Sequence, residues 1–226
     1  MCRIPFYITT KELIFLPNWC SNTHVFYTND ENKDELLRLY NNLSAVMQTP
    51  ATIKNDFEPG WLGQVAINHG LDWEKISCRG SIEHLDEYEP GRSFFKLESE
   101  TAWSPTDALW EAVIAEYSGV SYVYIAEEPG NEIFTNTDYS GVYFPEKYLL
   151  DICGDAPIPG DWFSGQDRPG DLDIREYFEN FDALVDCFFK ITGKVFNNFE
   201  ALQDYLSGLF DGAENTCANI HEFTGE

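Results

Sequence analysis

The fold is decided by SFFKLESETAWSPTDALWEAVIAEYSGVSYVYIAEEPGNEIFTNTDYSGVYF, residues 93–144. Its first part, Ser93–Trp103, alternates between two faces, as a strand with one buried face requires. A helix follows, because the hydroxyl of Ser104 can cap the first turn and Pro105 has no N–H to leave unsatisfied there. After the helix, Val120–Ala126 is rich in Tyr and Val. The stretch therefore predicts a strand, a helix and a second strand in succession.

A tight turn follows this second strand. The segment Glu128-Pro129-Gly130-Asn131 has Pro where one turn angle is preset and Gly or Asn where a positive φ is needed. It leads into a return strand at Glu132–Asn136, and one more strand is expected at residues 140–144. These two strands extend the predicted sheet.

The chain before residue 93 shows a similar pattern. Ser21–Thr28 alternates like a strand, and Asn29 or Asp30 can cap the helix that comes after it. Residues 50–80 mix apolar side chains with Gly and are expected to be an insertion with a short helix or turns. Beyond them, Ile82–Tyr88 forms a strand, joined to the next one by a hairpin turn.

Together these elements predict an α+β fold. From Leu16 to Ala126 their order is β-α-β-β-α-β, with two helices against one face of an antiparallel sheet, which is the ferredoxin-like sandwich. The extra strands extend this sandwich, and a helical C-terminal extension follows it. The ferredoxin-like domain is expected to span residues 16–150, after an N-terminal lead-in at residues 1–15.

The last third of the chain is expected to be a separate piece. Residues 151–172 are rich in Pro, Gly and Asp without periodicity, which predicts a linker or long loop. Residues 173–226 are expected to be a small helical unit, in which Ile174–Phe178 can form a strand and residues 181–193 and 197–209 form helices, with a frayed tail from Asp211. About fifty residues make a poor core alone, so the helices are expected to dock on the first domain.

The charge of the chain is strongly negative and unevenly spread. The net charge is −25, and residues 83–226 hold 30 acidic but only 7 basic side chains. Such a field repels nucleic acid and anionic membrane, so a basic protein is the expected partner.

The six cysteines lie far apart, and no two form a CxxC pair. No secretory signal is evident at the N-terminus, and no segment has the length of a membrane span. The cysteines are therefore expected to be reduced thiols, and the protein to be cytoplasmic.

Two motifs carry a resemblance to a known family: LPNWCSNTHVFYT (Leu16–Thr28) and ESETAWSPTDAL (Glu98–Leu109), the second followed by a Tyr-rich strand and an acidic turn. They resemble the YubB-type ferredoxin-like proteins of plasmids, conjugative elements and phages. The resemblance covers Leu16 to Phe144 and implies the fold and a mobile-element setting, but no catalytic residues. Leu16 stands where the family has Met, and fifteen residues precede it.

An acidic hairpin is the first candidate binding site. Glu127, Glu128, Glu132 and Asp138 cluster around one turn, and such oxygens could hold Ca²⁺ or Mg²⁺. No twelve-residue calcium loop is present, so a solvated acidic turn without metal is expected instead. Its exposed carboxylates are expected to contribute to partner binding and little to stability.

Other chemistry-bearing residues give weaker signals. Asp30 follows the first strand, where some ferredoxin-like nucleases keep a metal-binding Asp, but a helix cap explains it equally well. The four histidines are scattered and lack metal or catalytic spacing, so each is expected to be exposed or hydrogen-bonded. Trp19 and Trp103 are expected to be core residues, with aromatic anchors of an interface as the alternative.

These observations favour a non-enzymatic interaction protein with no cofactor, whose acidic face meets a basic partner. A DNA mimic that occupies the nucleic-acid site of a host defence or regulatory protein is one form of this hypothesis. The first alternative is a divalent-metal-dependent nuclease that uses Asp30. The second is a self-assembling protein, a homodimer formed through Phe188, Phe189 and Leu206.

Overall fold

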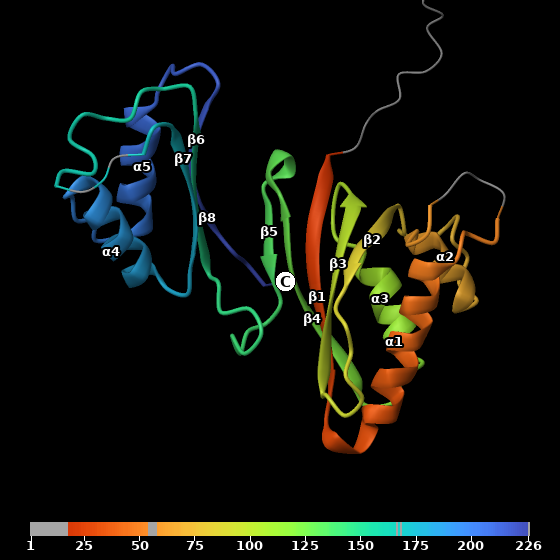
Figure 1. Cartoon of the computed structure of the whole chain (residues 1–226). Coiled ribbons are helices and arrows are strands. Elements are labelled where there is room, and N and C mark those ends of the chain that lie inside the picture. Colours follow the sequence, from red (N-terminus) through yellow and green to blue (C-terminus); the bar gives the residue numbers. More distant parts are fainter. Residues whose placement is uncertain (1–17, 54–57, 166, 168, 226) are drawn as a thin grey trace, which may run out of the picture.

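The computed structural model describes residues 18–53, 58–165, 167 and 169–225. The predicted lead-in at residues 1–15 lies outside these ranges. The described chain is α+β, as predicted, and contains two antiparallel sheets and five α-helices. Each sheet carries its helices on the face turned away from the other sheet (Figure 1).

The first sheet has five strands in the order β2-β3-β1-β4-β5, each antiparallel to its neighbours. Its strands are β1 (Trp19–Thr28), β2 (Gly80–Leu85), β3 (Phe94–Ala102), β4 (Val120–Glu128) and β5 (Ile133–Asn136). The strands predicted around residues 21–28, 82–88, 93–103, 120–126 and 132–136 are thereby confirmed.

Helices α1 (Lys33–Gln48), α2 (Leu62–Asn68) and α3 (Asp107–Ile114) belong to this first unit. The helix α1 turns Leu36, Leu39 and Leu43 inward at helical spacing, and all three are fully buried. They share one core with Phe26 of β1 and with Trp110 of α3. Burial of these side chains fixes which face of the sheet is covered and leaves the other face bare of helices.

The second unit combines a three-stranded sheet with two helices. Strand order is β7-β6-β8, formed by β6 (Tyr148–Gly154), β7 (Leu172–Phe178) and β8 (Thr216–Glu222). The helices α4 (Phe181–Thr192) and α5 (Phe199–Leu209) are capped by the preceding Asn180 and Asn198, whose side chains accept hydrogen bonds from backbone N–H groups of the first turn. They pack on their own sheet around Phe188, Leu206 and Ile152, so the prediction that they dock on the first domain is wrong.

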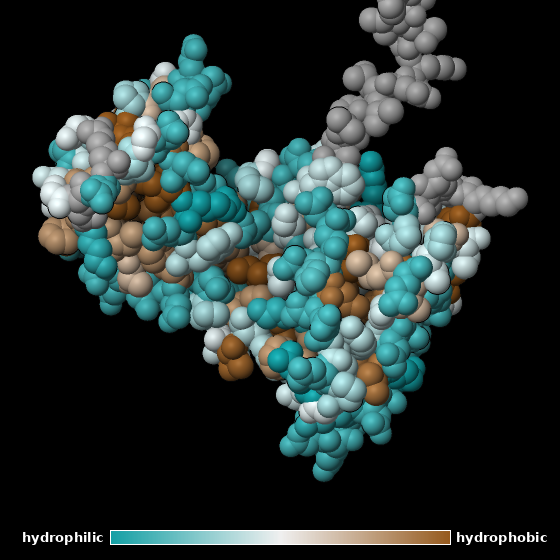
Figure 2. All heavy atoms as spheres, in the orientation of Figure 1, coloured by the Kyte–Doolittle hydropathy of each residue, from teal (hydrophilic) through white to brown (hydrophobic). Residues whose placement is uncertain are grey.

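The two units meet through the faces of the sheets that carry no helix. Phe134 of β5 packs with Leu149 of β6 and with Phe223, directly after β8. Backbone hydrogen bonds join the same region, from the N–H of Thr224 to the carbonyl of Phe134 at 3.0 Å and from the N–H of Asn136 to the carbonyl of Thr224 at 3.1 Å. In the space-filling view the outline is notched between the units beside this contact (Figure 2).

Three sequence predictions need correction here. The stretch 151–172 is not wholly a loop, because it holds the end of β6 and the start of β7. In the region 173–226, the strand expected at Ile174–Phe178 is confirmed as part of β7, but the tail, expected to be frayed, forms β8. No strand forms at 140–144, because the buried carboxylate of Asp138 binds backbone N–H groups of this stretch that a strand would use.

The start of α3 also differs from the prediction. The helix begins at Asp107 with Thr106 as the preceding residue, and the side chain of Thr106 makes no capping hydrogen bond. Ser104 lies outside the helix, and its carbonyl accepts a hydrogen bond from the Thr101 hydroxyl at 2.8 Å. Among the described residues, no helix combines the length and the apolar character needed to cross a membrane.

Candidate binding cleft

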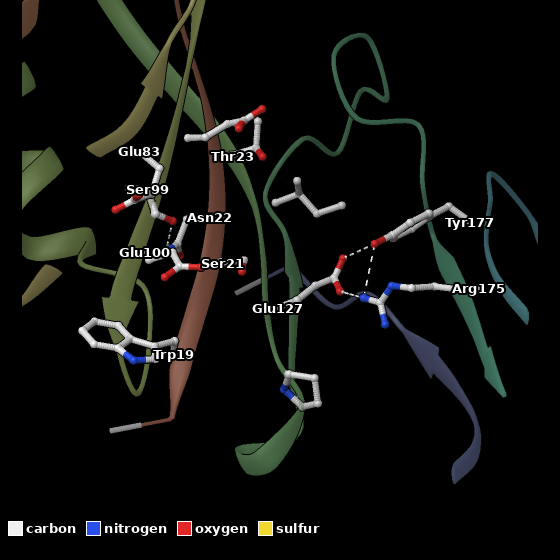
Figure 3. A pocket seen from close by; sticks show the side chains of 13 residues that line it. Trp19, Ser21, Asn22, Thr23, Glu83, Ser99, Glu100, Glu127, Arg175 and Tyr177 are labelled. Atoms are coloured by element: carbon white, nitrogen blue, oxygen red, sulfur yellow. Dashed lines mark hydrogen bonds and ion pairs between the residues drawn. The ribbon is translucent and has the colours of Figure 1, made fainter. Parts of the chain in front are cut away.

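A cleft lies between the helix-free face of the first sheet and strand β7 of the second. Its volume is about 480 Å³. One wall comes from β1, β3 and β4, and the other from Arg175 and Tyr177 of β7 (Figure 3). It is lined by Trp19, Ser21, Asn22, Thr23, Glu83, Glu98, Ser99, Glu100, Ile125, Glu127, Pro129, Arg175 and Tyr177.

Strand register arranges six of these side chains in two rows, which we call the cleft floor. In the first row, Ser21 of β1 lies between Glu100 of β3 and Glu127 of β4. In the second row, Thr23 lies between Glu98 and Ile125. Neighbouring strands are about 4.8 Å apart, so each row places three side chains within about 10 Å on one face. The cleft floor is therefore a band of three carboxylates and two hydroxyls with Ile125 at one edge.

Trp19 closes one end of the cleft and is not a core residue. Alternation along β1 places it on the same face as Ser21, and it is 48% exposed. Trp103 is 40% exposed and has a positive φ of 74°, with its N–H bonded to the carbonyl of Asn18. The prediction that both belong to the core is wrong, because Trp19 lies on the face that carries no helix and Trp103 lies beyond the end of β3. Only Trp19 lines the cleft.

Among the described residues, Arg175 is the one cation that lines the cleft, and it is already bound. Its guanidinium donates to Glu127 of β4 and, at 2.7 Å, to Asp151 of β6. The Tyr177 hydroxyl donates to the same Glu127 carboxylate at 2.8 Å. Burial and the nearby Glu127 carboxylate raise the pKa of Tyr177 above its ordinary value, so it remains a donor at neutral pH. Glu127 thus ties the two sheets together (Figure 3).

The acidic hairpin is not the solvated turn that the sequence predicts. Glu128 is only 2% exposed, and its carboxylate accepts the backbone N–H groups of Gly130 at 2.9 Å and Asn131 at 2.7 Å. These bonds fix the short 3₁₀ turn η2 (Pro129–Asn131). Glu132 is exposed and takes a left-handed backbone conformation with φ 57°. Of the four predicted binding carboxylates, only Glu127 lines the cleft.

Asp138 is also buried, at 2% exposure, and organises the loop after β5. Its carboxylate accepts backbone N–H groups from Ser140 and Gly141, both at 3.1 Å, from Tyr143 at 2.6 Å and from Phe144 at 3.0 Å. Burial alone would raise the pKa of Asp138, but the hydrogen bonds to the charged form outweigh it and hold this pKa below its ordinary value.

This loop, residues 137–147, covers one half of the helix-free face. The ring of Tyr143 lies 5.3 Å from that of Tyr27 and 5.4 Å from that of Phe94, centroid to centroid. The ammonium of Lys96 lies 5.9 Å from the ring centroid of Phe144. Because the loop stops there, the other half of the face, which holds the cleft floor, stays open.

Asp30 lies beyond the end of β1 opposite to Trp19, away from the cleft. It forms an ion pair with Lys33 at 2.7 Å, and its side chain is 91% exposed. Asn29 caps the short 3₁₀ turn η1 (Asp30–Asn32) that precedes α1, and its side chain accepts from the N–H of Glu31 at 3.2 Å, whereas Asn32 before α1 makes no side-chain cap bond. Within the described ranges, no group of three or more His, Cys, Asp or Glu side chains is arranged to hold a metal ion.

His24 departs from the prediction for the histidines. It is fully buried among Phe26, Trp110, Tyr122 and Tyr124, and neither ring nitrogen has a hydrogen-bond partner within the part of the chain that the structure describes. Burial in this aromatic environment lowers the pKa of His24 to about 3, so it is neutral in the folded protein at physiological pH.

The C-terminal helices do not offer the predicted dimer contact. Phe188 and Leu206 are fully buried in the second unit, and only Phe189 of the three is exposed, at 49%. The first two side chains are therefore unavailable to another copy without unfolding of the unit.

The sequence prediction missed Arg175, Tyr177, Glu98 and Glu100 as members of one site. The alternation of β3 already placed both glutamates on one face, but no local signal connected that face to β7. Comparison with known protein families, with curated proteins and with solved structures finds no match to this chain.

Proposed function

We propose that this chain is a cytoplasmic, non-enzymatic interaction protein whose cleft binds a basic segment of a partner protein. The observation that carries the proposal is the composition of the cleft lining, which has four glutamates against one arginine that is already paired. The exposed Glu83, Glu98 and Glu100 form no ion pair with another residue that the structure describes, so they add negative charge to the cleft.

The geometry suits lysine and arginine side chains of an extended segment. Carboxylates of Glu98 and Glu100 accept hydrogen bonds from ammonium or guanidinium groups, and such charge-assisted bonds are the stronger class. The hydroxyls of Ser21 and Thr23 add acceptors beside them. The half-exposed ring of Trp19 offers a face for a cation at the end of the cleft. The net charge of −25 would accelerate association with a basic partner.

The wider setting is part of the proposal. The strand order β2-β3-β1-β4, with α1 and α3 in the connections, supports the ferredoxin-like arrangement of the first unit. The YubB-type resemblance and the acidic charge together favour a mobile-element protein that acts as a DNA mimic. In this form of the proposal, the partner is a host protein that presents a nucleic-acid-binding surface to the cleft.

Binding of a short arginine-rich peptide, followed by fluorescence anisotropy, tests the proposal. Glu98→Gln with Glu100→Gln should weaken binding about tenfold, mainly through slower association and more at low salt than at high salt. The matched control removes two exposed carboxylates from the outer helices, Asp186→Asn and Asp204→Asn. Equal losses in the two double variants would show only non-specific attraction and would reject the cleft as the site.

A further inference from the structure

Two free cysteines face each other across neighbouring strands of the second sheet. Cys153 of β6 and Cys217 of β8 are direct partners in the strand register. Alternation places both on the face of the sheet that carries no helix, because the adjacent Ile152 points into the core with the helices. Cys153 is exposed and Cys217 is half-buried, so small molecules can reach the pair.

The register also fixes the distance between the two backbones. The N–H of Asp155 binds the carbonyl of Asn215 at 3.3 Å, and the N–H of Phe223 binds the carbonyl of Lys147 at 2.9 Å. Hydrogen-bonded pairs recur at every second position, which makes Cys153 and Cys217 such a pair with Cα atoms about 5.5 Å apart. Disulfides span Cα separations of about 4.4–6.8 Å, so the backbone separation lies within their range. The Cβ atoms of a hydrogen-bonded pair lie at the wide end of about 4.5–5.5 Å, beyond the roughly 3.5–4.5 Å of a relaxed disulfide, so closure also needs a small local adjustment of the strands and gives a strained, more easily reduced bond.

We propose that Cys153 and Cys217 are a reversible redox site, which closes to a cross-strand disulfide when a small disulfide such as oxidised glutathione is present. In the first step, one cysteine thiolate attacks the small disulfide, forms a mixed disulfide and releases one small thiol. In the second step, the other cysteine thiolate attacks the protein sulfur of the mixed disulfide and releases the second small thiol. Two protein thiols are oxidised, one small disulfide is reduced to two thiols, and no other reactant is needed.

Residues around Cys153 and Cys217 affect the reactivity of the two thiols. The amide of Asn219 donates a hydrogen bond to Sγ of Cys217 at 3.0 Å. Burial, together with the nearby Asp151, Cys217 and Asp173, raises the pKa of Cys153. Because the thiolate is the reactive form, closure is slow at neutral pH and accelerates as the pH rises. The bond is also exposed once formed, and exposed disulfides are the ones that thiols reduce readily.

The other described cysteines have no such partner. Cys20 and Cys78 are buried in the first unit, and the thiol of Cys187 contacts the Glu176 carboxylate at 3.3 Å on the helix side of β7. Cys187 is therefore the control residue in the experiment below, because it is a half-buried thiol of the second unit that lacks a facing cysteine.

Formation of the disulfide would link β8, the last strand of the fold, covalently to β6. β8 pairs only with β6 in its sheet, and the residue Thr224 after it makes the backbone hydrogen bonds to the first unit. A disulfide between β6 and β8 closes a long loop that contains β7, α4 and α5, and so restricts the unfolded chain. Oxidation is expected to raise the melting temperature of the second unit.

The test treats the reduced full-length protein with oxidised glutathione and follows intact mass and peptide mapping. The expected product has lost two hydrogen atoms, carries a Cys153–Cys217 link and returns to the starting mass with dithiothreitol. Cys187→Ser should give the same product, whereas Cys153→Ser and Cys217→Ser should each stop at a stable glutathione adduct on the remaining cysteine.

Thermal unfolding in the presence of dithiothreitol shows whether each serine variant folds. If a serine variant does not fold, the corresponding alanine variant replaces it in the test. A stable glutathione adduct on the native protein without the internal link would overturn the proposal. A link that maps to any other pair would do the same.

Discussion

Arg175 of β7 is ion-paired with Glu127 of β4, so a single guanidinium joins the two sheets across the cleft. The same guanidinium also binds Asp151 of β6. The side chains of Glu127 and Asp151 are only 15% and 16% exposed, and within the described part of the chain Arg175 is the cation that pairs with both. Arg175 therefore stabilises the contact between the units while it lowers the negative charge available to a basic ligand.

The substitution Arg175→Gln should separate these two effects. The free energy of unfolding should fall by about 1 kcal/mol, a modest cost because the guanidinium is 41% exposed and water screens its ion pairs. Binding of the arginine-rich peptide should become about threefold tighter, because the substitution removes a positive charge from the cleft. Urea denaturation and anisotropy titration measure the two quantities.

The control for this variant is Arg92→Gln. Arg92 forms a 3.8 Å ion pair with Glu89 in which both side chains are at least half exposed, and it does not line the cleft. This control should change neither quantity appreciably. If Arg175→Gln weakened peptide binding while the fold stayed intact, the ligand would be anionic or neutral and the proposed function would be wrong.

Glu128 should matter for stability although it lies in a turn. The variant Glu128→Gln leaves one oxygen where two now accept the N–H groups of Gly130 and Asn131. Loss of a capping carboxylate costs about 1 kcal/mol, which should appear as a lower melting temperature in calorimetry. Glu132→Gln is the control, because Glu132 is exposed, and it should leave the melting temperature unchanged. Equal melting temperatures for the two variants would mean that the η2 turn does not depend on the carboxylate.

Asp138→Ala should release the loop at residues 137–147. Four backbone N–H groups would lose their acceptor, with an expected cost of about 2 kcal/mol or more in urea denaturation. The loop should also become sensitive to limited proteolysis, which the exposed control Asp204→Asn should not cause. Because the pKa of Asp138 is lower in the folded state, its contribution is present above the ordinary value of 3.8 and is lost as the pH falls below it. A loop that stays resistant to protease in Asp138→Ala would contradict this role.

The elements that could be predicted from sequence are those with a local period. Strands β1, β3 and β4 alternate clearly, and α1, α4 and α5 each show one apolar stripe. Strand β8 lacks this signal, because its residues Thr216–Asn219 have mostly small or polar side chains. The strand is ordered by its pairing with β6. Local pattern therefore identified most elements, β7 included, but not β6 and β8.

The cleft depended on information that no local pattern holds. The alternation of side chains along β1 indicates that Trp19 and Phe26 lie on opposite faces of the strand. Which of the two faces is covered depends on the packing of the helices. The pair between Glu127 and Arg175 joins residues 48 positions apart. Glu128 was misjudged because acidic turn residues are usually solvated, whereas here the carboxylate folds back on its own turn.

His24 should make the protein sensitive to mild acid. Its pKa is about 3 in the folded state against an ordinary value of 6.5, so between these values the unfolded chain binds more protons than the folded one. Stability should therefore be at its full value above pH 6.5 and fall as the pH decreases, by on the order of 3 kcal/mol near pH 4. The stabilisation by Asp138 is intact across most of this window and is lost at lower pH, since its pKa is held below the ordinary value of 3.8.

The variant His24→Phe isolates this effect. Phenylalanine keeps the aromatic contacts with Phe26, Trp110 and Tyr124, and it removes two buried ring nitrogens that have no hydrogen-bond partner within the described ranges. At neutral pH its free energy of unfolding should equal or exceed that of the native protein. Between pH 6.5 and pH 4 the difference should widen in favour of the variant.

Urea denaturation at a series of pH values measures this difference. Burial also lowers the pKa of His221, so some acid sensitivity should remain in His24→Phe, and His221→Phe is the matched control with a smaller effect. Where the larger phenylalanine ring strains the core, His24→Leu provides the same comparison. Parallel pH profiles for the native protein and both His24 variants would show that His24 is protonated in the folded state, and that the aromatic environment does not exclude its charge.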